Sequence, residues 1–258
     1  MPRDYADVDY ARLTTEDRNP IKRKLQKLRL QHSLQVLKKM PPNFSGAILD
    51  FGAGNGELCK QISLRLPNSQ IVCYEPSAKL RQQAIENTEN FKNILVTGNL
   101  KNSAMEAFDF IFCLEVFEHL PPEEMKAALK SMRQLLKKEG KLIIGVPNEI
   151  FLPALLKGSL RLMRRYGEVD ARPGPVLKAF LGRPPKARET VSFDGLPYIL
   201  RHIGFDYREF KAVISQYFRI EQSYGSPFTF LPLSFNFEIY LICRRKKNAT
   251  SRNLEGQN

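Results

Sequence analysis

The sequence predicts an α/β protein built on a doubly wound, mostly parallel sheet of seven strands. Three observations predict this class. Short apolar runs alternate with helical patterns along residues 44–148, a glycine-rich turn follows the first run, and two more apolar runs lie near the end of the chain. Buried strands that alternate with helices are typical of parallel sheets covered on both faces. With 258 residues and 43% hydrophobic content, we expect one domain with a large core.

The chain before the first strand is expected to form an arm and a helix. Residues 1–18 are polar and partly acidic, which indicates a mobile arm and no signal peptide. Residues 19–40 are predicted to be an N-terminal helix, because Asn19 can cap it and Pro20 suits its first turn. Leucine and isoleucine recur at helical spacing to about Lys39. This helix is expected to pack over the ligand edge of the sheet.

Residues 44–148 carry the core of the predicted sheet. Strands are expected at Ala47–Leu49, Gln70–Tyr74, Ile94–Thr97, Phe108–Leu114 and Lys141–Val146. The helices between them are expected at Glu57–Leu66, at Ala78–Asn87 and from Pro122 through Leu136, with Gly140 closing the last one. Proline and acids favour the start of that last helix.

The remainder of the chain departs from this alternation. Residues 149–193 combine apolar, basic and proline-rich stretches, and so long an interruption typically serves as a lid or a substrate-binding insertion. Residues 194–247 are assigned to a final helix and two strands, and Asp206 with Glu209 resembles a capping box at the start of that helix. The strands are expected at Phe218–Tyr224 and Phe237–Cys243, and a disordered tail at 248–258.

The positive charge is concentrated in two stretches. The net charge is +13; residues 20–40 hold seven Lys or Arg and no acid, and residues 157–188 hold nine against Glu168 and Asp170. Such localised charge favours an anionic partner, and two solvated basic faces are the alternative.

The cysteines indicate a reducing compartment. All four lie in apolar or helical patterns and form no CxxC pair: Cys59, Cys73, Cys113 and Cys243. They are predicted to be small buried hydrophobes, not disulfides or zinc ligands. No apolar run approaches the length of a membrane span. The sequence therefore favours a cytoplasmic protein.

The glycine-rich turn is the first candidate binding element. Residues 47–59 read AILDFGAGNGELC, with Gly52, Gly54 and Gly56 in alternate positions after Asp50. Glycine lacks a β-carbon, so the turn can adopt positive φ angles and let a ligand lie against its backbone. In an open α/β sheet this strand edge is where ligands bind. An ordinary strand-to-helix turn is the alternative.

Glu75 strengthens the binding interpretation. It follows the second strand, 25 residues beyond Asp50. A carboxylate at that strand end can accept both hydroxyls of a ribose. The glycine turn and Glu75 together predict a site for a ligand that contains a nucleoside.

Several motifs in this order resemble the class I S-adenosylmethionine-dependent methyltransferase family, whose fold is Rossmann-like. They are LDFGAGNGELC, the acid of CYEP, FDFIFCLEVFEHL and LLKKEGKLIIGVPN. The resemblance covers residues 47–148 and is closest to the small-molecule type, such as ubiquinone-biosynthetic and sugar or lipid O-methyltransferases. Methyltransferases that act on amino groups of DNA or glutamine place an Asn/Asp-Pro-Pro-aromatic motif where this chain has LEVFEH, which argues against those enzymes. We therefore expect transfer to oxygen.

The resemblance implies a set of cofactor-binding residues: Arg29, Asp50, Gly52, Gly54, Gly56, Glu75, Asn99, Glu115 and Val116. The acid and glycines of the first turn would line the methionine end of S-adenosyl-L-methionine, and Glu75 would hold its ribose. Asn99 stands where the family often has an aspartate near the adenine amine, and its amide oxygen can still accept that hydrogen bond. Glu115 and Val116 would lie beside the sulfonium, and Arg29 would bind the cofactor carboxylate.

Histidines are the candidate catalytic bases. Methyl transfer depends mainly on positioning and on the exclusion of water, and a hydroxyl acceptor also gains from a base. Histidine suits that role at neutral pH. His119, in the EVFEH segment, is the first candidate and His202 the second; a structural or capping histidine is the alternative for each. The three histidines of the chain are scattered without carboxylate spacing, so no metal is expected.

Three functions stay open. The first is a cytoplasmic methyltransferase for a small-molecule, glycan or lipid-linked substrate, for which basic residues 149–193 favour a phosphate-bearing acceptor or peripheral contact with an anionic inner membrane face. The second is an RNA-directed methyltransferase, which is not favoured because aromatics are not interleaved with the basic runs. The third is a non-catalytic module that binds S-adenosylmethionine.

Overall fold

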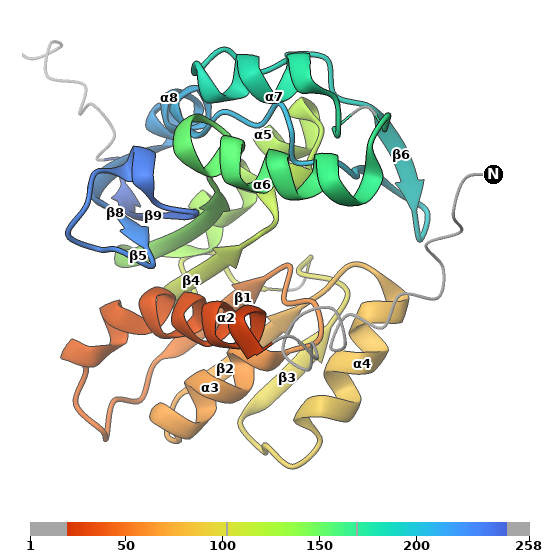
Figure 1. Cartoon of the computed structure of the whole chain (residues 1–258). Coiled ribbons are helices and arrows are strands. Elements are labelled where there is room, and N and C mark those ends of the chain that lie inside the picture. Colours follow the sequence, from red (N-terminus) through yellow and green to blue (C-terminus); the bar gives the residue numbers. More distant parts are fainter. Residues whose placement is uncertain (1–19, 102, 169, 247–258) are drawn as a thin grey trace, which may run out of the picture.

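A computed structural model describes residues 20–101, 103–168 and 170–246 (Figure 1). The arm expected at residues 1–18, the cap at Asn19 and the tail at 248–258 lie outside the described residues. Within the described ranges, no helix is both long enough and apolar enough to cross a membrane.

Seven strands form one sheet in the order β3-β2-β1-β4-β5-β9-β8. They are β1 (Ala47–Phe51), β2 (Gln70–Tyr74), β3 (Ile94–Thr97), β4 (Phe108–Leu114), β5 (Leu136–Pro147), β8 (Phe218–Ser226) and β9 (Glu238–Arg245). β9 runs antiparallel to both β5 and β8, and the other neighbours are parallel. The prediction of a doubly wound, mostly parallel seven-stranded sheet is confirmed. The strand order reverses between β1 and β4, which is the position where such sheets bind ligands.

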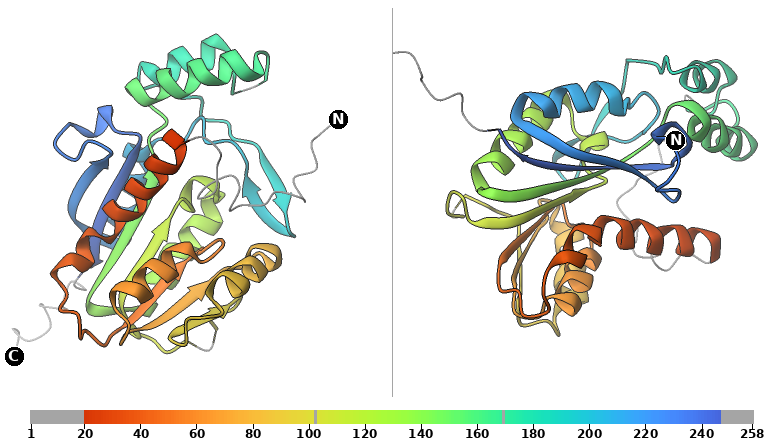
Figure 2. Two further views of the ribbon diagram at one scale, coloured as in Figure 1. Left: turned by 60° about the horizontal axis from the view of Figure 1, so that its bottom comes forward. Right: turned by 90° about the vertical axis from the view of Figure 1, so that its left-hand side faces the viewer.

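Helices cover both faces of the sheet (Figure 2). They are α2 (Pro20–Ser33), α3 (Glu57–Arg65), α4 (Ala78–Thr88), α5 (Pro122–Leu135) and α8 (Tyr207–Tyr217). Successive side chains of a strand point to opposite faces, so each strand serves two cores. In β4, Phe110 and Phe112 pack in the core under α3, whereas Ile111 and Cys113 pack in the core under α5 and α8. All four cysteines are free and buried, as predicted.

The N-terminal helix ends earlier than expected. The α-helix stops at Ser33, and Leu34–Lys39 forms a 3-10 helix, η2. Two side-chain hydroxyls donate hydrogen bonds to backbone carbonyls at the end of this helix, in competition with backbone N–H groups. Ser33 Oγ donates to Leu30 O, and the Tyr224 hydroxyl donates to His32 O. The tighter η2 turn also buries three apolar side chains, so tertiary contacts decide the change of helix type.

Gly140 does not close a helix, contrary to expectation. α5 ends at Leu135, and Gly140 lies inside β5, whose first residue, Leu136, pairs with Phe108 of β4. A β-carbon at Gly140 would lie 3.0 Å from the backbone oxygens of Phe108 and Asp109. The glycine is therefore needed for the close approach of two strands.

The insertion after β5 folds into two helices and a hairpin. These are α6 (Phe151–Arg165), α7 (Pro173–Phe180), β6 (Thr190–Phe193) and β7 (Leu196–Ile199). The hairpin continues to Ile199, so the expected boundary at residue 193 divides one structural unit. α6 and α7 lie side by side at one end of the molecule (Figures 1 and 2). Gly158 allows this contact, because a β-carbon there would lie 2.4 Å from Val176 Cγ1.

Candidate active site

A cavity of about 230 Å³ opens at the carboxyl ends of β1, β2 and β4. Its walls come from α2, the glycine turn after β1, the residues after β2 and β4, and the hairpin β6–β7. Asp194, in the hairpin turn, accepts a hydrogen bond from Ser77 Oγ at 2.8 Å. The insertion thus reaches across the edge of the sheet where the switch point lies.

The glycine turn has the conformation that its sequence predicts. Gly52, Gly54 and Gly56 have φ angles of 79°, 56° and 77°. A β-carbon at Gly52 would lie 2.5 Å from Val116 Cγ2, so only glycine fits between the two loops. Gly52 and Gly54 line the cavity, whereas Gly56 precedes α3 and packs against Thr88 of α4.

Glu75 links the glycine turn to the end of β2. Its Oε2 accepts from Gly54 N at 2.8 Å, and its Oε1 accepts from Ser77 N at 2.9 Å. Burial raises the pKa of Glu75 to about 7, although these two amides and Arg81 favour ionisation. Each carboxylate oxygen has a second lone pair, so the group can still accept from ligand hydroxyls.

Asp50 is the second buried acid of the cavity. It is the fourth residue of β1, only 2% of its surface is exposed, and Cys59 Sγ donates to its Oδ2 at 3.5 Å. Burial raises the pKa of Asp50 to about 7. Two carboxyl groups that titrate near neutral pH therefore lie on the cavity wall.

Arg29 reaches the cavity from α2 and forms ion pairs with two carboxylates. It contacts Glu115, and its Nη2 lies 3.2 Å from Glu238 Oε1. Burial opposes ionisation of Glu115, but Arg29 outweighs it and lowers the pKa of Glu115 to about 2. Burial raises the pKa of Glu238, against the effect of Arg29. The ionised Glu115 thus compensates the charge of Arg29 before any ligand is bound, and Glu238 adds a second contact.

The backbone of Glu115 is in the left-handed region, with φ of 57°. Such a conformation is uncommon for a residue other than glycine and is often found at functional sites. It turns the chain after β4, where Glu115 and Val116 both line the cavity.

Asn99 does not line this cavity. It is exposed and lies on a neighbouring cavity, where its Oδ1 accepts from Lys101 N at 2.8 Å. The two cavities share Gly52, Pro76, Val116, Leu120, Leu196 and Pro197 as lining residues. The structure therefore places Asn99 in an adjoining compartment, apart from the other predicted residues.

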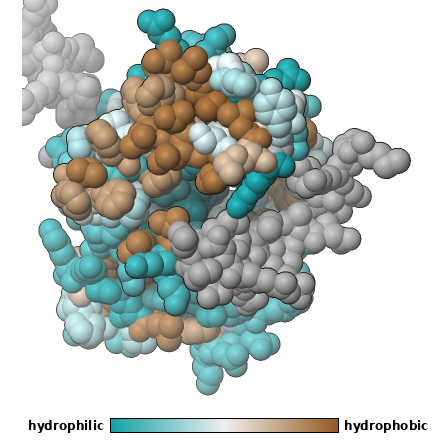
Figure 3. Space-filling view, viewed as in Figure 1, coloured by the Kyte–Doolittle hydropathy of each residue, from teal (hydrophilic) through white to brown (hydrophobic). Residues whose placement is uncertain are grey.

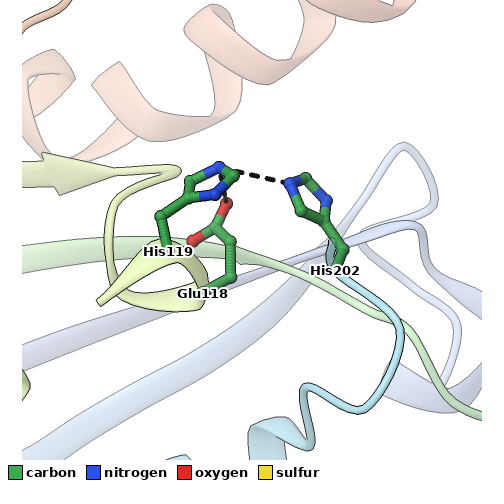
Figure 4. Close-up of side chains that lie close together, drawn as sticks. All are labelled: Glu118, His119 and His202. Carbon is green, nitrogen blue, oxygen red and sulfur yellow. Dashed lines mark hydrogen bonds and ion pairs between the residues drawn. The ribbon is translucent and has the colours of Figure 1, made fainter. Parts of the chain in front are cut away.

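His119 and His202 are in contact, although 83 residues separate them in the chain. Their Nε2 atoms lie 3.2 Å apart (Figure 4). His119 Nδ1 lies 2.8 Å from the Ile199 carbonyl oxygen, which can only accept, so Nδ1 carries the proton. Burial lowers the pKa of both histidines, that of His202 to about 4. The expectation of scattered histidines is wrong for this pair, because the hairpin β6–β7 brings His202 beside the end of β4.

Three further residues of this site were not identified from the sequence. Glu118 is fully buried next to His119, Glu238 pairs with Arg29, and the ring of Tyr198 stacks on His119 with centroids 4.4 Å apart. Glu118 belongs to the EVFEH segment, so the motif could have identified it as a site residue from the sequence. Glu238 and Tyr198 come from distant elements with no motif of their own.

Comparisons with known proteins show similarity to methyltransferases. Residues 49–142 match the family described as a methyltransferase domain. An uncharacterized methyltransferase of Oceanobacillus iheyensis is 27% identical over 149 residues, which are 56% of this chain and 68% of that protein. Another, from Bacillus cytotoxicus, is 30% identical over 112 residues, which are 43% of this chain and 52% of that protein, about half its length.

Solved structures share the fold at low sequence identity. A protein from Pyrococcus horikoshii is matched with a TM-score of 0.57 and 16% identity over 93% of this chain and 99% of its own. An S-adenosylmethionine-dependent methyltransferase from Aquifex aeolicus is matched with a TM-score of 0.53 and 16% identity, over 86% of this chain and 97% of its own.

Proposed function

The chain belongs to the class I S-adenosylmethionine-dependent methyltransferase family, and from this premise we propose that it transfers a methyl group to an oxygen of a small-molecule, glycan or lipid-linked acceptor. The observation that carries this proposal is the hydrogen bond from Gly54 N to Glu75 Oε2. It joins the glycine turn and the ribose-binding acid at the switch point of the sheet.

The cavity suits S-adenosyl-L-methionine. Gly52 and Gly54 present bare backbone to the cavity, and Glu75 keeps lone pairs for two hydroxyls. We assign the methionine end to Asp50 and the glycine turn, and the adenine to the adjoining compartment with Asn99. The bound cofactor supplies a methyl group that is already activated on a sulfonium sulfur.

The residues after β4 are proposed to surround the sulfonium. Glu115 is anionic at neutral pH because Arg29 lowers its pKa, so it complements a positive sulfur. Val116 shapes the apolar wall on that side. Arg29 remains our proposed partner for the cofactor carboxylate through its guanidinium donors, in addition to its two ion pairs.

His119 and His202 are proposed to act on the acceptor side. His119 lines the cavity, and the Ile199 carbonyl fixes the proton on its Nδ1. Its Nε2, which lies 3.2 Å from His202 Nε2, therefore carries the lone pair that we propose takes the proton of an acceptor hydroxyl. His202 does not line the cavity, and its Nε2 contacts the Nε2 of His119. Tyr198 stacks on His119 and keeps the ring in place.

A surface on the insertion supports a lipid-linked acceptor. Exposed apolar side chains gather over α6 and α7 (Figure 3): Leu156, Leu160, Met163, Tyr166, Leu177 and Leu181. We call this set the α6–α7 surface. Residues 157–188, which contain five of these six side chains, also hold nine Lys or Arg. Apolar residues flanked by cations are typical of peripheral contact with an anionic membrane, which we propose for this surface.

The transfer reaction is tested by incubating the protein with radiolabelled S-adenosylmethionine and fractionated cell extract. Label in a lipid or glycan fraction is the expected result. Label in RNA would support the RNA-directed alternative instead, and no transfer to any fraction from a protein that binds the cofactor would support the non-catalytic module.

The membrane contact is tested by co-sedimentation with vesicles. We expect binding to phosphatidylglycerol-containing vesicles to exceed binding to pure phosphatidylcholine, and Met163→Glu to weaken it. Met163 is 83% exposed on α6, and Leu64, 67% exposed on α3, provides the matched control Leu64→Glu. Equal binding to both vesicle types would remove the proposal, as would equal losses in the two variants.

A further inference from the structure

The guanidinium group of Arg188 joins the two segments that carry His119 and His202. Arg188 lies in the insertion, between α7 and β6. One of its nitrogens, Nη2, donates to two backbone carbonyl oxygens, that of Glu118 and, at 3.0 Å, that of Arg201. These two carbonyls belong to the residues directly before the two histidines in the chain. A single NH₂ group therefore holds both peptide groups that lead into the histidines.

The surrounding side chains and backbone keep Arg188 in this position. Its Cζ lies 5.6 Å from the centroid of the Phe205 ring, and an aromatic face attracts a cation. The chain is closely packed here, because a β-carbon at Gly204 would lie 2.4 Å from Pro185 O and 3.1 Å from Arg188 Cγ. Burial lowers the pKa of Arg188, but an arginine stays charged at neutral pH, so both hydrogen bonds are charge-assisted.

The contact between the two imidazoles depends on how these two segments are placed. The Nε2 atoms lie 3.2 Å apart (Figure 4). His119 carries its proton on Nδ1, where it donates to the Ile199 carbonyl, so the proton between the two rings comes from His202 Nε2. A shift of about 1 Å in either backbone lengthens this contact beyond the range of a hydrogen bond. The tie between the two segments therefore controls the contact.

We propose that Arg188 is a positioning residue that sets the distance between His119 and His202 by bonding the peptide groups before them. Arg188 does not line the cavity, so it acts through the histidines and not on the cofactor or the acceptor. Lysine would not replace it, because the side chain ends one atom earlier and has no planar fork of donors.

This position matters for the proposed reaction. His119 lies on the cavity wall, and an acceptor hydroxyl that donates to its Nε2 must exchange with the N–H of His202. The distance between the rings therefore decides how readily that lone pair becomes available. A base misplaced by about 1 Å can slow a reaction about 100-fold. This effect on the rate rests on the proposed methyl transfer, whereas the effect on the histidine pair does not.

The histidine pair is observed by NMR on full-length protein labelled with ¹⁵N only in its three histidines. Long-range proton–nitrogen spectra distinguish Nδ1–H from Nε2–H, and single histidine substitutions assign the signals. We expect His119 as the Nδ1–H tautomer in the wild type. In Arg188→Ala the imidazole signals of His119 and His202 should both shift. Those of His32 should not, because its Nδ1 lies beside Ser226 Oγ, outside this contact.

Arg208 provides the matched control, because it makes the same kinds of contact elsewhere. Its Cζ lies 5.2 Å from the centroid of the Phe151 ring, and its Nη2 donates to Gly182 O at 2.6 Å. Arg208→Ala should keep the wild-type signals of both histidines of the pair. A folded Arg188→Ala protein with unchanged signals would overturn the proposal, as would equal shifts in the two alanine variants. Should Arg188→Ala fail to fold by circular dichroism, Arg188→Lys is judged by the same criterion.

Methyl transfer is measured separately, at saturating S-adenosylmethionine, over a dilution series of the extract fraction that takes the label. Arg188→Ala should lower the maximal rate about 10- to 100-fold. Its affinity for S-adenosylmethionine in calorimetry should stay within twofold of wild type. Arg188→Lys should resemble Arg188→Ala, and a wild-type rate in Arg188→Lys would show that charge alone matters and overturn the positioning role.

The two measurements separate the two proposals. Shifted histidine signals with a wild-type rate would confine Arg188 to the structure of the pair and overturn its effect on the reaction. Absence of transfer by the wild type would count against the proposed methyl transfer, and the NMR comparison would still decide whether Arg188 positions the histidines.

Discussion

Replacing Glu75 by Gln removes one negative charge from the cavity and keeps the shape of the side chain. Its two carboxylate oxygens accept from Gly54 N at 2.8 Å and from Ser77 N at 2.9 Å. An amide must place its NH₂ group against one of these two donors. One hydrogen bond is lost, so we expect the free energy of unfolding of the cofactor-free protein to fall by about 0.5–1.5 kcal/mol.

The effect of Glu75→Gln on cofactor affinity should be larger. A hydrogen bond to a charged group contributes about 1.5–3 kcal/mol, so losing one from a ribose hydroxyl weakens binding by about 10- to 150-fold. Calorimetric titration with S-adenosylmethionine and with S-adenosylhomocysteine measures the change. Glu86→Gln, which alters an exposed acid on α4, is the control. A folded Glu75→Gln protein that binds within twofold of wild type would refute the assignment.

The pH dependence of binding follows from the same residue. Burial raises the pKa of Glu75 from 4.5 to about 7, so the folded protein binds this proton more tightly than the unfolded chain. Its stabilising contribution is therefore present at low pH and is lost as pH rises from about 4.5 to about 7. Ribose hydroxyls favour the ionised carboxylate, so affinity should rise about 10-fold from pH 6 to pH 8. Glu75→Gln should remove most of this dependence of affinity on pH. Asp50→Asn measures how much of the dependence comes from Asp50, the other buried acid.

Two further substitutions test the packing around the site. Gly52→Ala meets both a positive φ of 79° and a clash with Val116, so chemical denaturation should show a loss of about 2–4 kcal/mol. Gly195 has a φ of 76°, and a β-carbon there would meet no neighbouring atom. Gly195→Ala should therefore lower the free energy of unfolding only by the cost of the backbone strain. Equal losses of stability in the two variants would contradict the clash at Gly52. Glu149→Gln breaks a buried pair with two cations of α6, so thermal unfolding should show a loss of about 3 kcal/mol. Burial opposes ionisation of Glu149, but these cations lower its pKa to about 2, so its contribution is lost as pH falls from about 4.5 toward 2.

The strands were predictable because their signal is local. β2, β3 and β4 have the predicted bounds, since each is a mainly apolar run that ends where a polar residue or glycine begins. Helix type and glycine roles were less predictable. The 3-10 segment Leu34–Lys39 and the strand position of Gly140 depend on contacts with Tyr224, Phe108 and other residues far along the chain.

The candidate site also contains a part that was predictable from local sequence and a part that depends on distant contacts. Asp50, the glycine turn and Glu75 lie within one βαβ unit, and the geometry of that unit brings them together whatever follows in the chain. Their roles in binding the cofactor stay predictions. The partners of Arg29 and His119 were not available to sequence reasoning, because Glu238 and His202 come from β9 and the segment after the insertion.

The sequence by itself determined the sheet, the switch point and the residues that we predict to bind a methyl donor, because hydrophobic periodicity and turn chemistry act over a few residues. Only the tertiary structure decided which groups meet beside the cavity at the end of β4. The hairpin β6–β7 bends back over the sheet edge, so His202 reaches His119 above the buried Glu118. No periodicity or spacing encodes that contact, because it depends on how the insertion packs against the finished core.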